Sequence, residues 1–262
     1  MNDAAPLLAI KIGNTNLAFG LFRGERLEAT WRFETLADRT ADEYAALLLP
    51  SLERAQIPPG AIRAAALVSV VPRLVETMRE LCRTCLGLEP FIAAAGVKSG
   101  IRITYDDPRA LGADRLVDLV AARARYGAPC IVVDLGTAAT FNALDENGDF
   151  VGGAIAPGLN MAANALHQFT AKLPRVDVSA PDRALATNTR DALRSGIFFG
   201  YVALVEGMVA RLRREMDLPH VTVIATGGLA QLLAPHCPTI EHVDMNLALE
   251  GLRLMYEMNR GK

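Results

Sequence analysis

The chain of 262 residues is long enough for one large domain or two of ordinary size, and 51% of its residues are hydrophobic, as in soluble globular proteins. Its net charge of −2 gives no support for nucleic-acid binding, which usually requires a basic surface. We expect no membrane association, because no apolar run approaches the roughly 20 residues that span a bilayer. The first ten residues also lack the pattern of a secretory signal, so we expect a cytoplasmic protein.

Strands alternate with helices in the first half of the chain, which indicates α/β layers. The expected strands are 7–12, 16–22, 27–33, 64–71 and 90–93, and the expected helices are 41–55 and 73–86. The first two strands are joined by the tight turn Gly13-Asn14-Thr15.

The second half repeats this opening, because Cys130 to Leu144 again reads as strand, glycine turn and strand. When the two hairpins are aligned, Gly13 matches Gly136 and Lys11 matches Asp134. Such a repeat indicates duplicated domains. The other expected elements are the strands 150–155 and 221–226 and the helices 112–126, 158–167, 189–214 and 246–259.

These patterns predict two packed lobes with a cleft between them. The N-terminal lobe, 1–111, holds the first hairpin, and the C-terminal lobe, 112–245, holds the second hairpin and a third glycine turn at Thr226-Gly227-Gly228. The helix within 246–262 is expected to pack back on the N-terminal lobe.

The cysteines give only a weak signal for metal or redox chemistry. Cys82 and Cys85 have CxxC spacing but fall within a helical pattern, and Cys130 and Cys237 form no second close pair. Structural zinc usually needs four ligands. We therefore interpret all four as thiols in a reducing compartment.

The two glycine hairpins suggest a nucleotide site. Oriented backbone amides and Thr or Asn side chains bind phosphate oxygens well, and the third glycine turn allows a nucleobase or ribose to approach the backbone. A single glycine hairpin more often only satisfies backbone geometry. The repetition of the hairpin, together with the third turn, favours the nucleotide interpretation.

Two aspartates are candidates for the chemistry of phosphoryl transfer, which needs a group to receive the proton of the acceptor. Asp114 follows Gly112 at a helix start and is the candidate base, although an aspartate there often only caps the helix. Asp134 ends an apolar strand, where its charge needs a cation or hydrogen-bond donors, so a metal ion is a natural partner. The four histidines match no zinc or triad spacing, and we interpret them as structural or surface residues.

Several segments occur in the order found in type III pantothenate kinases, and the chain resembles that family over nearly its whole length. They are Gly13-Asn14-Thr15-Asn16, Gly112-Ala113-Asp114-Arg115, Asp134-Leu135-Gly136-Thr137, Gly152 to Gly158, Thr170 to Pro174 and Thr226-Gly227-Gly228. The resemblance implies the fold of the acetate/sugar kinase, Hsp70 and actin superfamily. That fold is α/β, with two duplicated actin/ribonuclease H-like lobes, each a mixed sheet flanked by helices, and the nucleotide cleft between them. It also implies a homodimer that transfers phosphate from ATP to pantothenate, giving 4′-phosphopantothenate, the first step of coenzyme A biosynthesis.

The resemblance also implies a role for each matching residue. Asp114 resembles the catalytic base, and Asp134 resembles the ligand of a monovalent cation, K⁺ or NH₄⁺. The residues implied to line the pantothenate pocket are Tyr105, Gly112, Ala113, Asp114, Arg115 and, across the dimer interface, Thr189. The residues implied to bind ATP are Lys11, Ile12, Gly13, Asn14, Thr15, Asn16, Leu17, Ala18, Gly136, Thr137, Gly227 and Gly228.

The sequence departs from this family at Lys11, because the family pattern is Asp-x-Gly-Asn-Thr and its aspartate is linked to Mg²⁺ and phosphate handling. A protonated lysine has no acceptor for a metal. Its charge would repel Mg²⁺ by several kcal/mol at an effective dielectric of about 20. A lysine can instead contact phosphate as a point charge, or turn its amine into water. We expect impaired activity or an altered metal dependence.

Three functions remain open at this stage. The leading hypothesis is a type III pantothenate kinase. The alternative from another class is a noncatalytic homologue that binds nucleotide or pantothenate and has a regulatory or interaction role; Lys11 alone motivates it. A kinase for another hydroxyl substrate is weaker, because the segments Gly112–Arg115 and Thr170–Pro174 match the pantothenate family.

Overall fold

The computed structural model of the protein describes residues 5–260. Its internal contacts divide the chain into two compact units. Unit 1 comprises Met1–Gly100, Asp106–Ala121 and Leu247–Lys262, and unit 2 comprises Ile101–Tyr105 and Ala122–Asn246. The lobe boundaries expected at residues 112 and 246 stay predictions.

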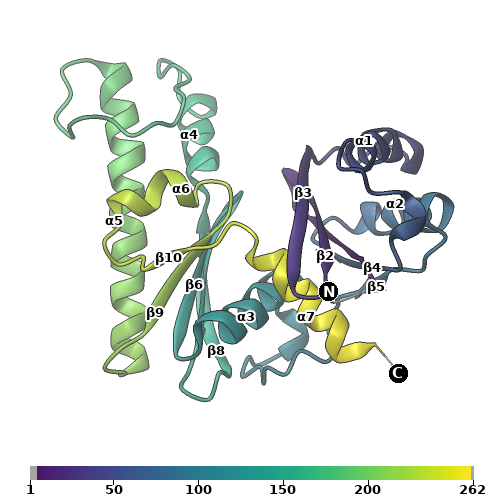
Figure 1. The fold of residues 1–262 in the computed structure, drawn as a ribbon. Helices are drawn as coiled ribbons and strands as arrows, with labels where there is room; N and C mark the ends of the chain where they lie inside the picture. Colours follow the sequence, from purple (N-terminus) through teal and green to yellow (C-terminus); the bar gives the residue numbers. More distant parts are fainter. Residues whose placement is uncertain (1–4, 261–262) are drawn as a thin grey trace. The chain divides into compact units, whose positions relative to one another are not determined.

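Unit 1 contains a mixed five-stranded sheet with the order β3-β2-β1-β4-β5 (Figure 1). Its strands are β1 (Leu7–Ile12), β2 (Asn16–Arg23), β3 (Arg26–Glu34), β4 (Ala64–Ser69) and β5 (Phe91–Ile92). The first three strands form an antiparallel meander, and β1 pairs in parallel with β4, which pairs in parallel with β5. The predicted hairpin and its continuation are confirmed.

Helices α1 (Ala41–Arg54) and α2 (Pro72–Leu81) cover one face of this sheet (Figure 1). Helix α1 begins at Thr40, whose hydroxyl and backbone form a capping box with Glu43. The core beneath these helices includes Ile10 and Ile12 from β1, together with Tyr44. Helix α2 continues as a π-helical turn, η2 (Cys82–Leu86), and this turn contains both cysteines of the CxxC segment as free thiols.

Unit 1 also contains the first part of one helix, which continues into unit 2 after Ala121, and the whole of another. They are α3 (Ala113–Tyr126) and α7 (Leu247–Asn259). Helix α7 packs on β1, β2 and β4. It approaches α3 so closely that a Cβ on Gly251 would lie 1.7 Å from the carbonyl oxygen of Val117. Two short 3-10 turns, η1 (Pro59–Ala61) and η3 (Pro108–Ala110), lie in the connections.

Unit 2 repeats the topology of unit 1, with the strand order β10-β9-β6-β7-β8. Its strands are β6 (Cys130–Leu135), β7 (Ala138–Leu144), β8 (Phe150–Pro157), β9 (Thr222–Thr226) and β10 (His242–Val243). The first three again form an antiparallel meander, and β6 pairs in parallel with β9, which pairs in parallel with β10. The predicted duplication is therefore confirmed strand by strand.

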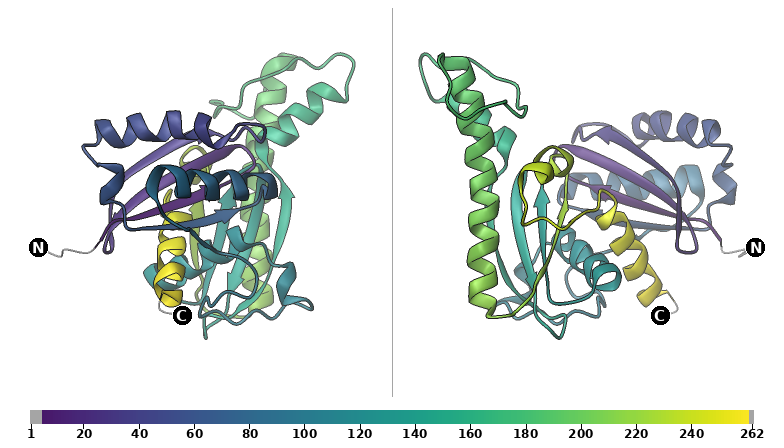
Figure 2. Two further views of the ribbon diagram at one scale, coloured as in Figure 1. Left: turned by 90° about the vertical axis from the view of Figure 1, so that its right-hand side faces the viewer. Right: turned by 60° about the vertical axis from the view of Figure 1, so that its left-hand side comes forward.

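The helices of unit 2 are α4 (Leu159–Gln168), α5 (Thr189–Met216) and the short α6 (Ala230–Leu233), which is followed by the 3-10 turn η4 (Ala234–His236). The long α5 runs beside the sheet (Figure 2). It packs Phe198, Val205 and Val209 into the second hydrophobic core. The sequence patterns predicted α5 but neither α6 nor β10.

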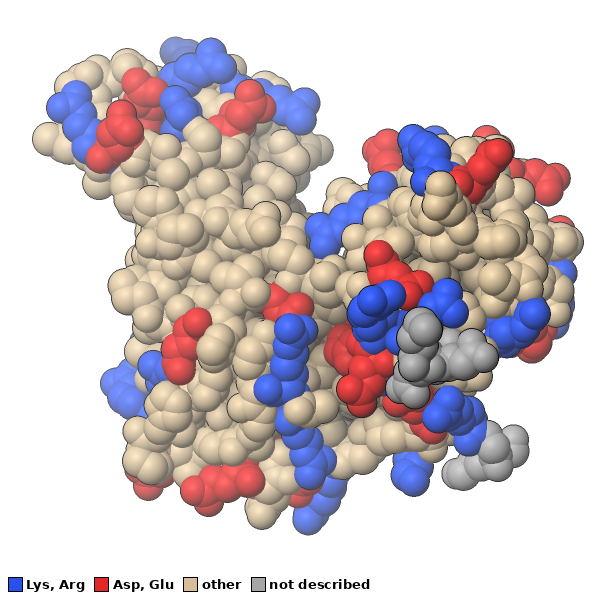
Figure 3. Space-filling view, viewed as in Figure 1, with Lys and Arg blue, Asp and Glu red and all other residues tan. Residues whose placement is uncertain are grey.

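Helix α5 corrects the expectation that no segment would be long and apolar enough to cross a bilayer. Its 28 residues contain a window with a mean hydropathy of 1.4, which passes that test by length and composition only. Between Arg194 and Arg211 its only charged residue is Glu206, and Figure 3 shows few charged side chains over this part of the surface. A core helix of a soluble protein passes the same test, so this single helix is weak evidence for a membrane span.

Candidate active site

The hairpin between β1 and β2 is a firmly held turn with exposed polar residues. The backbone N–H of Gly13 donates to the carbonyl oxygen of Asn16 at 3.0 Å. Thr35 anchors the turn, because its hydroxyl donates to the carbonyl of Gly13 at 2.8 Å and its N–H donates to the carbonyl of Thr15 at 2.9 Å. The side chains of Asn14, Thr15 and Asn16 are exposed. The turn thus presents polar groups at the end of β1.

The turn between β6 and β7 is also closed by a hydrogen bond from the N–H of its glycine, but it is one residue shorter, with three residues between the paired Leu135 and Ala139. The N–H of Gly136 donates to the carbonyl oxygen of Ala138 at 3.1 Å, and the carbonyl of Thr137 accepts from the N–H of Gly158 at 3.1 Å. A Cβ on Gly158 would lie only 2.1 Å from the Thr137 oxygen and 2.6 Å from the Gly136 oxygen. Only glycine fits at this position, which holds the loop after β8 against the second turn.

Asp134 lies between two glycine turns of unit 2. A Cβ on Gly227 would lie 2.2 Å from its Oδ1 atom, and a Cβ on Gly136 would lie 3.3 Å from the same atom. Gly227 has φ +90°, a conformation that side chains rarely adopt. Gly228 beside it has open space around its Cα. The structure therefore brings Gly227 together with Asp134 and Gly136, which the sequence placed in a different segment.

Tyr201 also belongs to this corner, and the sequence patterns missed it. Its hydroxyl donates to the carbonyl oxygen of Pro157 at 3.1 Å. Burial, with a smaller contribution from the negative charge of Asp134, raises the pKa of Tyr201 to about 12, although a hydrogen bond from the backbone of Leu159 acts in the opposite direction. No local signal marks this tyrosine, because its position within the apolar stretch of α5 reads only as core.

Asp114 stands in the first turn of α3, as expected. The helix begins with a hydrogen bond from the N–H of Leu116 to the carbonyl of Gly112 at 3.1 Å. A Cβ on Gly112 would lie 2.5 Å from Oδ1 of Asp114, so a residue with a side chain at 112 would displace this carboxylate. The next residue, Arg115, is buried. Asp114 and the first hairpin both belong to unit 1.

Two of the expected substrate residues lie elsewhere in unit 2. The ring of Tyr105 contacts Phe150 edge to face, with centroids 4.9 Å apart. Thr189 is exposed at the first residue of α5, after Asn188, whose side chain accepts from the N–H of Asp191 at 3.0 Å. The roles assigned to both residues remain predictions.

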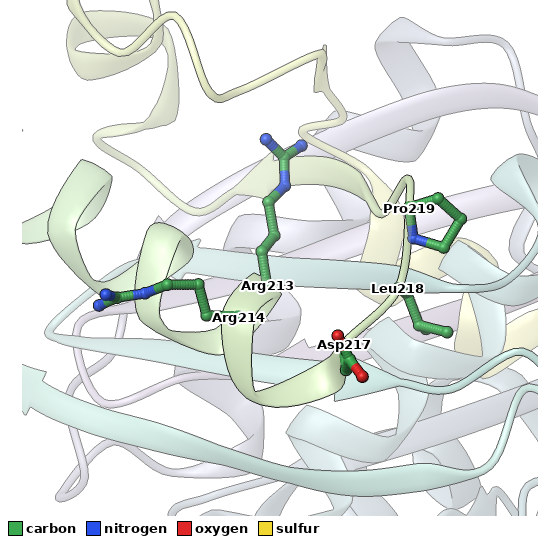
Figure 4. Close-up of a pocket in the computed structure, with 5 residues that line it drawn as sticks. All are labelled: Arg213, Arg214, Asp217, Leu218 and Pro219. Atoms are coloured by element: carbon green, nitrogen blue, oxygen red, sulfur yellow. The ribbon is translucent and has the colours of Figure 1, made fainter.

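A hollow of about 580 Å³ at the C-terminal end of α5 contains none of the expected site residues. Arg213 and Arg214 line it, together with Asp217, Leu218 and Pro219. Figure 4 shows the two arginine side chains pointing in different directions. Arg213 already donates to the carbonyl oxygen of Val221 at 2.7 Å and to Glu241 at 2.9 Å. We assign no ligand to this hollow.

Comparison with known proteins decides the family. A family model described as type III pantothenate kinase matches residues 7–211. The chain belongs to the type III pantothenate kinase family. A type III pantothenate kinase of Acidiphilium cryptum is 48% identical over 248 residues, which cover 95% of this chain and 93% of that protein. One of Dehalococcoides mccartyi strain CBDB1 is 44% identical over 254 residues, which cover 97% of this chain and 96% of the other.

Solved structures support the fold of this type III pantothenate kinase family member. A Baf family protein of Campylobacter jejuni has a TM-score of 0.61 at 20% identity and covers 97% of this chain and 100% of its own. Component A of (R)-2-hydroxyglutaryl-CoA dehydratase from Acidaminococcus fermentans has a TM-score of 0.56 at 13% identity, covering 95% of each chain. The fold is therefore the α/β fold of the actin-like ATPases and sugar kinases, as the resemblance implied.

Proposed function

We propose that the protein transfers the γ-phosphoryl group of ATP to the hydroxyl of pantothenate, giving 4′-phosphopantothenate, and does so as a homodimer in the cytoplasm. The observation that carries the proposal is the sequence identity of 44% and 48% to two type III pantothenate kinases over nearly the whole length of both chains. A glycine hairpin between the central strand and its antiparallel neighbour occurs in each unit and supports the same proposal.

Asp114 is our proposed catalytic base. Its carboxylate lies against Gly112 in the first turn of α3. An ionised carboxylate can accept the proton of the pantothenate hydroxyl as the hydroxyl oxygen attacks phosphorus. The neighbouring residues Gly112, Ala113 and Arg115 would contact pantothenate. Tyr105 and, across the dimer interface, Thr189 are the other pantothenate residues that the family resemblance implies.

The corner around Asp134 fits a monovalent cation. The carboxylate stands beside Gly136, and the carbonyl oxygens of Gly136 and Thr137 converge on Gly158 within the same loop structure. Carboxylate and carbonyl oxygens are the ligands that hard cations take in proteins, and K⁺ is commonly held by carbonyl oxygens. A cation there would offset negative charge of ATP phosphates bound at Thr137, Gly227 and Gly228. Asp134, Gly136 and Thr137 would hold this ion.

Mg²⁺ is the other cation that the family implies, and the residues at the end of β1 do not fit it. The segment from Lys11 to Ala18 contains no carboxylate, and the side chain of Lys11 has three donors and no acceptor. We therefore assign no Mg²⁺ ligand in this hairpin.

An apolar surface on unit 2 supports the homodimer. Seven of the eight exposed large hydrophobic side chains among the described residues belong to unit 2, and six of them lie between residues 151 and 185. These six residues lie on β8, on α4 and in the segment after α4. They include Ile155 and Phe169, which are 65% and 81% exposed. Exposed apolar surface of this kind marks protein–protein contacts when its side chains are contiguous, and β8 already presents Val151 and Ile155 on one face. A second copy of the chain is the occupant we propose.

The experiment for this function is product detection by mass spectrometry. Purified protein with ATP, MgCl₂, KCl and pantothenate should form 4′-phosphopantothenate, and omission of ATP or pantothenate should abolish the product. Replacement of K⁺ by Na⁺ should reduce the amount of 4′-phosphopantothenate formed. If the protein binds nucleotide but forms no product in any mixture, the proposal fails and the noncatalytic alternative motivated by Lys11 takes its place.

A further inference from the structure

Lys11 and Asp134 are equivalent positions of the duplicated fold. Strands β1 and β6 are the central strands of their sheets, and each has six residues with the same order of burial, the first four and the last being buried. Lys11 and Asp134 are the partly exposed fifth residues. One residue separates each of them from the glycine of the following turn, Gly13 or Gly136. Unit 1 thus carries an ammonium where unit 2 carries a carboxylate.

The side chain of Lys11 belongs to the sheet face opposite the α1 and α2 core. Because strand residues alternate between faces, Lys11 faces away from Ile10 and Ile12, which are part of that core. Helix α7 covers this face of the sheet at Gly20 and Phe22, through Leu249 and Arg253 respectively. These two residues of β2 pair with Ala9 and Leu7, toward the other end of β1.

Lys11 also lies at the carboxyl edge of the sheet of unit 1. The parallel strands β1 and β4 end together there, with Ile12 paired to Ser69. In open α/β sheets ligands bind at the carboxyl ends of the parallel strands. The ammonium is therefore placed at the edge where a ligand is expected, next to the exposed polar turn Asn14–Asn16.

The charges at this edge fit an anion and do not fit a divalent cation. The hairpin from Lys11 to Ala18 has no carboxylate, and Mg²⁺ sites in kinases use one or two carboxylates besides phosphate oxygens. Within residues 5–260, no three His, Cys, Asp or Glu side chains gather into a group that could hold a metal ion. A lysine ammonium binds phosphate oxygens as a point charge with charge-assisted hydrogen bonds.

We propose that Lys11 binds the phosphate oxygens of the nucleotide directly, so that unit 1 takes up nucleotide without a divalent cation. This inference rests on the proposed use of ATP and adds to it a changed metal requirement. The turn beside Lys11 supplies backbone and hydroxyl donors, and Thr35 holds it through Gly13 and Thr15. The ammonium supplies the positive charge that a carboxylate-bound metal would otherwise bring to the phosphates.

The test is calorimetric titration of the full chain with ADP, once in EDTA and once in excess MgCl₂. The wild type should bind ADP in EDTA within about threefold of its affinity in Mg²⁺. The affinity of Lys11→Met for ADP in EDTA should be lower than that of the wild type by about tenfold or more, as expected for the loss of one charge-assisted contact. Lys11→Arg should retain most of the affinity, because it keeps the charge. Lys11→Asp should bind weakly in EDTA and regain affinity when Mg²⁺ is added.

Lys98→Met is the matched control, since it removes an exposed lysine of the same unit and should leave both affinities unchanged. Thermal unfolding without nucleotide shows whether each variant is folded. The proposal is overturned if the ADP affinity of the wild type is more than about tenfold weaker in EDTA than in Mg²⁺. It is also overturned if folded Lys11→Met binds ADP in EDTA as tightly as the wild type does. If the affinities follow the expectation but no phosphopantothenate forms, the proposed function fails while this inference stands.

Discussion

The carboxylate of Asp134 and the backbone of Gly227 lie in such close contact that a Cβ at residue 227 would be 2.2 Å from Oδ1. Asp134 belongs to β6, and Gly227 directly follows β9, whose last residue, Thr226, pairs with Asp134. This contact joins the second glycine hairpin to the third glycine turn. It explains why the corner requires glycine, and it leads to a direct test.

Replacement of Gly227 by alanine should destabilise the protein. The left-handed backbone at φ +90° costs about 1–2 kcal/mol for a residue with a side chain, and the clash with Asp134 adds to that cost. We expect the Tm to fall by at least about 3 °C. Gly228→Ala is the control, because its Cβ would meet nothing within 4 Å. Equal melting temperatures for the two variants would contradict the described packing.

Asp114→Asn should remove most of the catalysis. Loss of a general base lowers kcat by about 10²–10⁴-fold, whereas nucleotide affinity and Tm should stay near the wild-type values. Asp106→Asn, at an exposed aspartate nearby in the chain, should keep full activity. A steady-state assay of ADP formation measures both variants. Wild-type turnover by Asp114→Asn would rule out its role as the base.

Tyr201 should make stability depend on alkaline pH. Its pKa is raised to about 12, so the folded state retains the phenolic proton when the unfolded state, with a pKa near 10, loses it. The stabilising contribution is present below about pH 10 and is lost as the pH rises toward 12. Urea unfolding should show that the wild type loses about 1 kcal/mol more than Tyr201→Phe between about pH 9 and about pH 11. Buried cysteines are common to both proteins and cancel in the comparison. Equal losses would mean that Tyr201 is not desolvated.

A charge on the apolar surface of unit 2 should weaken the homodimer. Ile155 is 65% exposed on β8, so Ile155→Lys costs little in an isolated chain but buries a lysine if a second copy covers it. We expect light scattering to show a dimer for the wild type and a shift toward monomer for the variant. Leu36→Lys, at an exposed leucine of unit 1, should leave the mass unchanged. A wild-type monomer at all concentrations would refute the dimer.

The sequence patterns predict the central strands well because their signals are local. Alternating and continuous apolar runs, interrupted by glycine, give the strands beginning at Leu7 and Asn16 and the repeat at Cys130, and the structure agrees. The corner at Asp134 was found for the same reason, since a carboxylate that ends an apolar strand is conspicuous in any sequence.

The features missed in the sequence depend on tertiary contacts. Strand β10 has two exposed residues, His242 and Val243, and exists because β9 supplies a free edge in the correct direction. The proximity of Tyr201 to Asp134 joins residues far apart in the chain, and nothing in the helical pattern around Tyr201 indicates it. The equivalence of Lys11 and Asp134, by contrast, was predicted by aligning the two hairpins in the sequence, and the matching burial patterns of β1 and β6 agree with it.

The most direct test of the account is the rate of 4′-phosphopantothenate formation by the wild type and by Lys11→Asp, measured side by side with saturating ATP, pantothenate, Mg²⁺ and K⁺. We predict that the wild type forms the product and that Lys11→Asp is no faster, because this chain binds phosphate through its lysine. No product from the wild type, together with a large gain in Lys11→Asp, would contradict the account and identify Lys11 as the residue that disables the site.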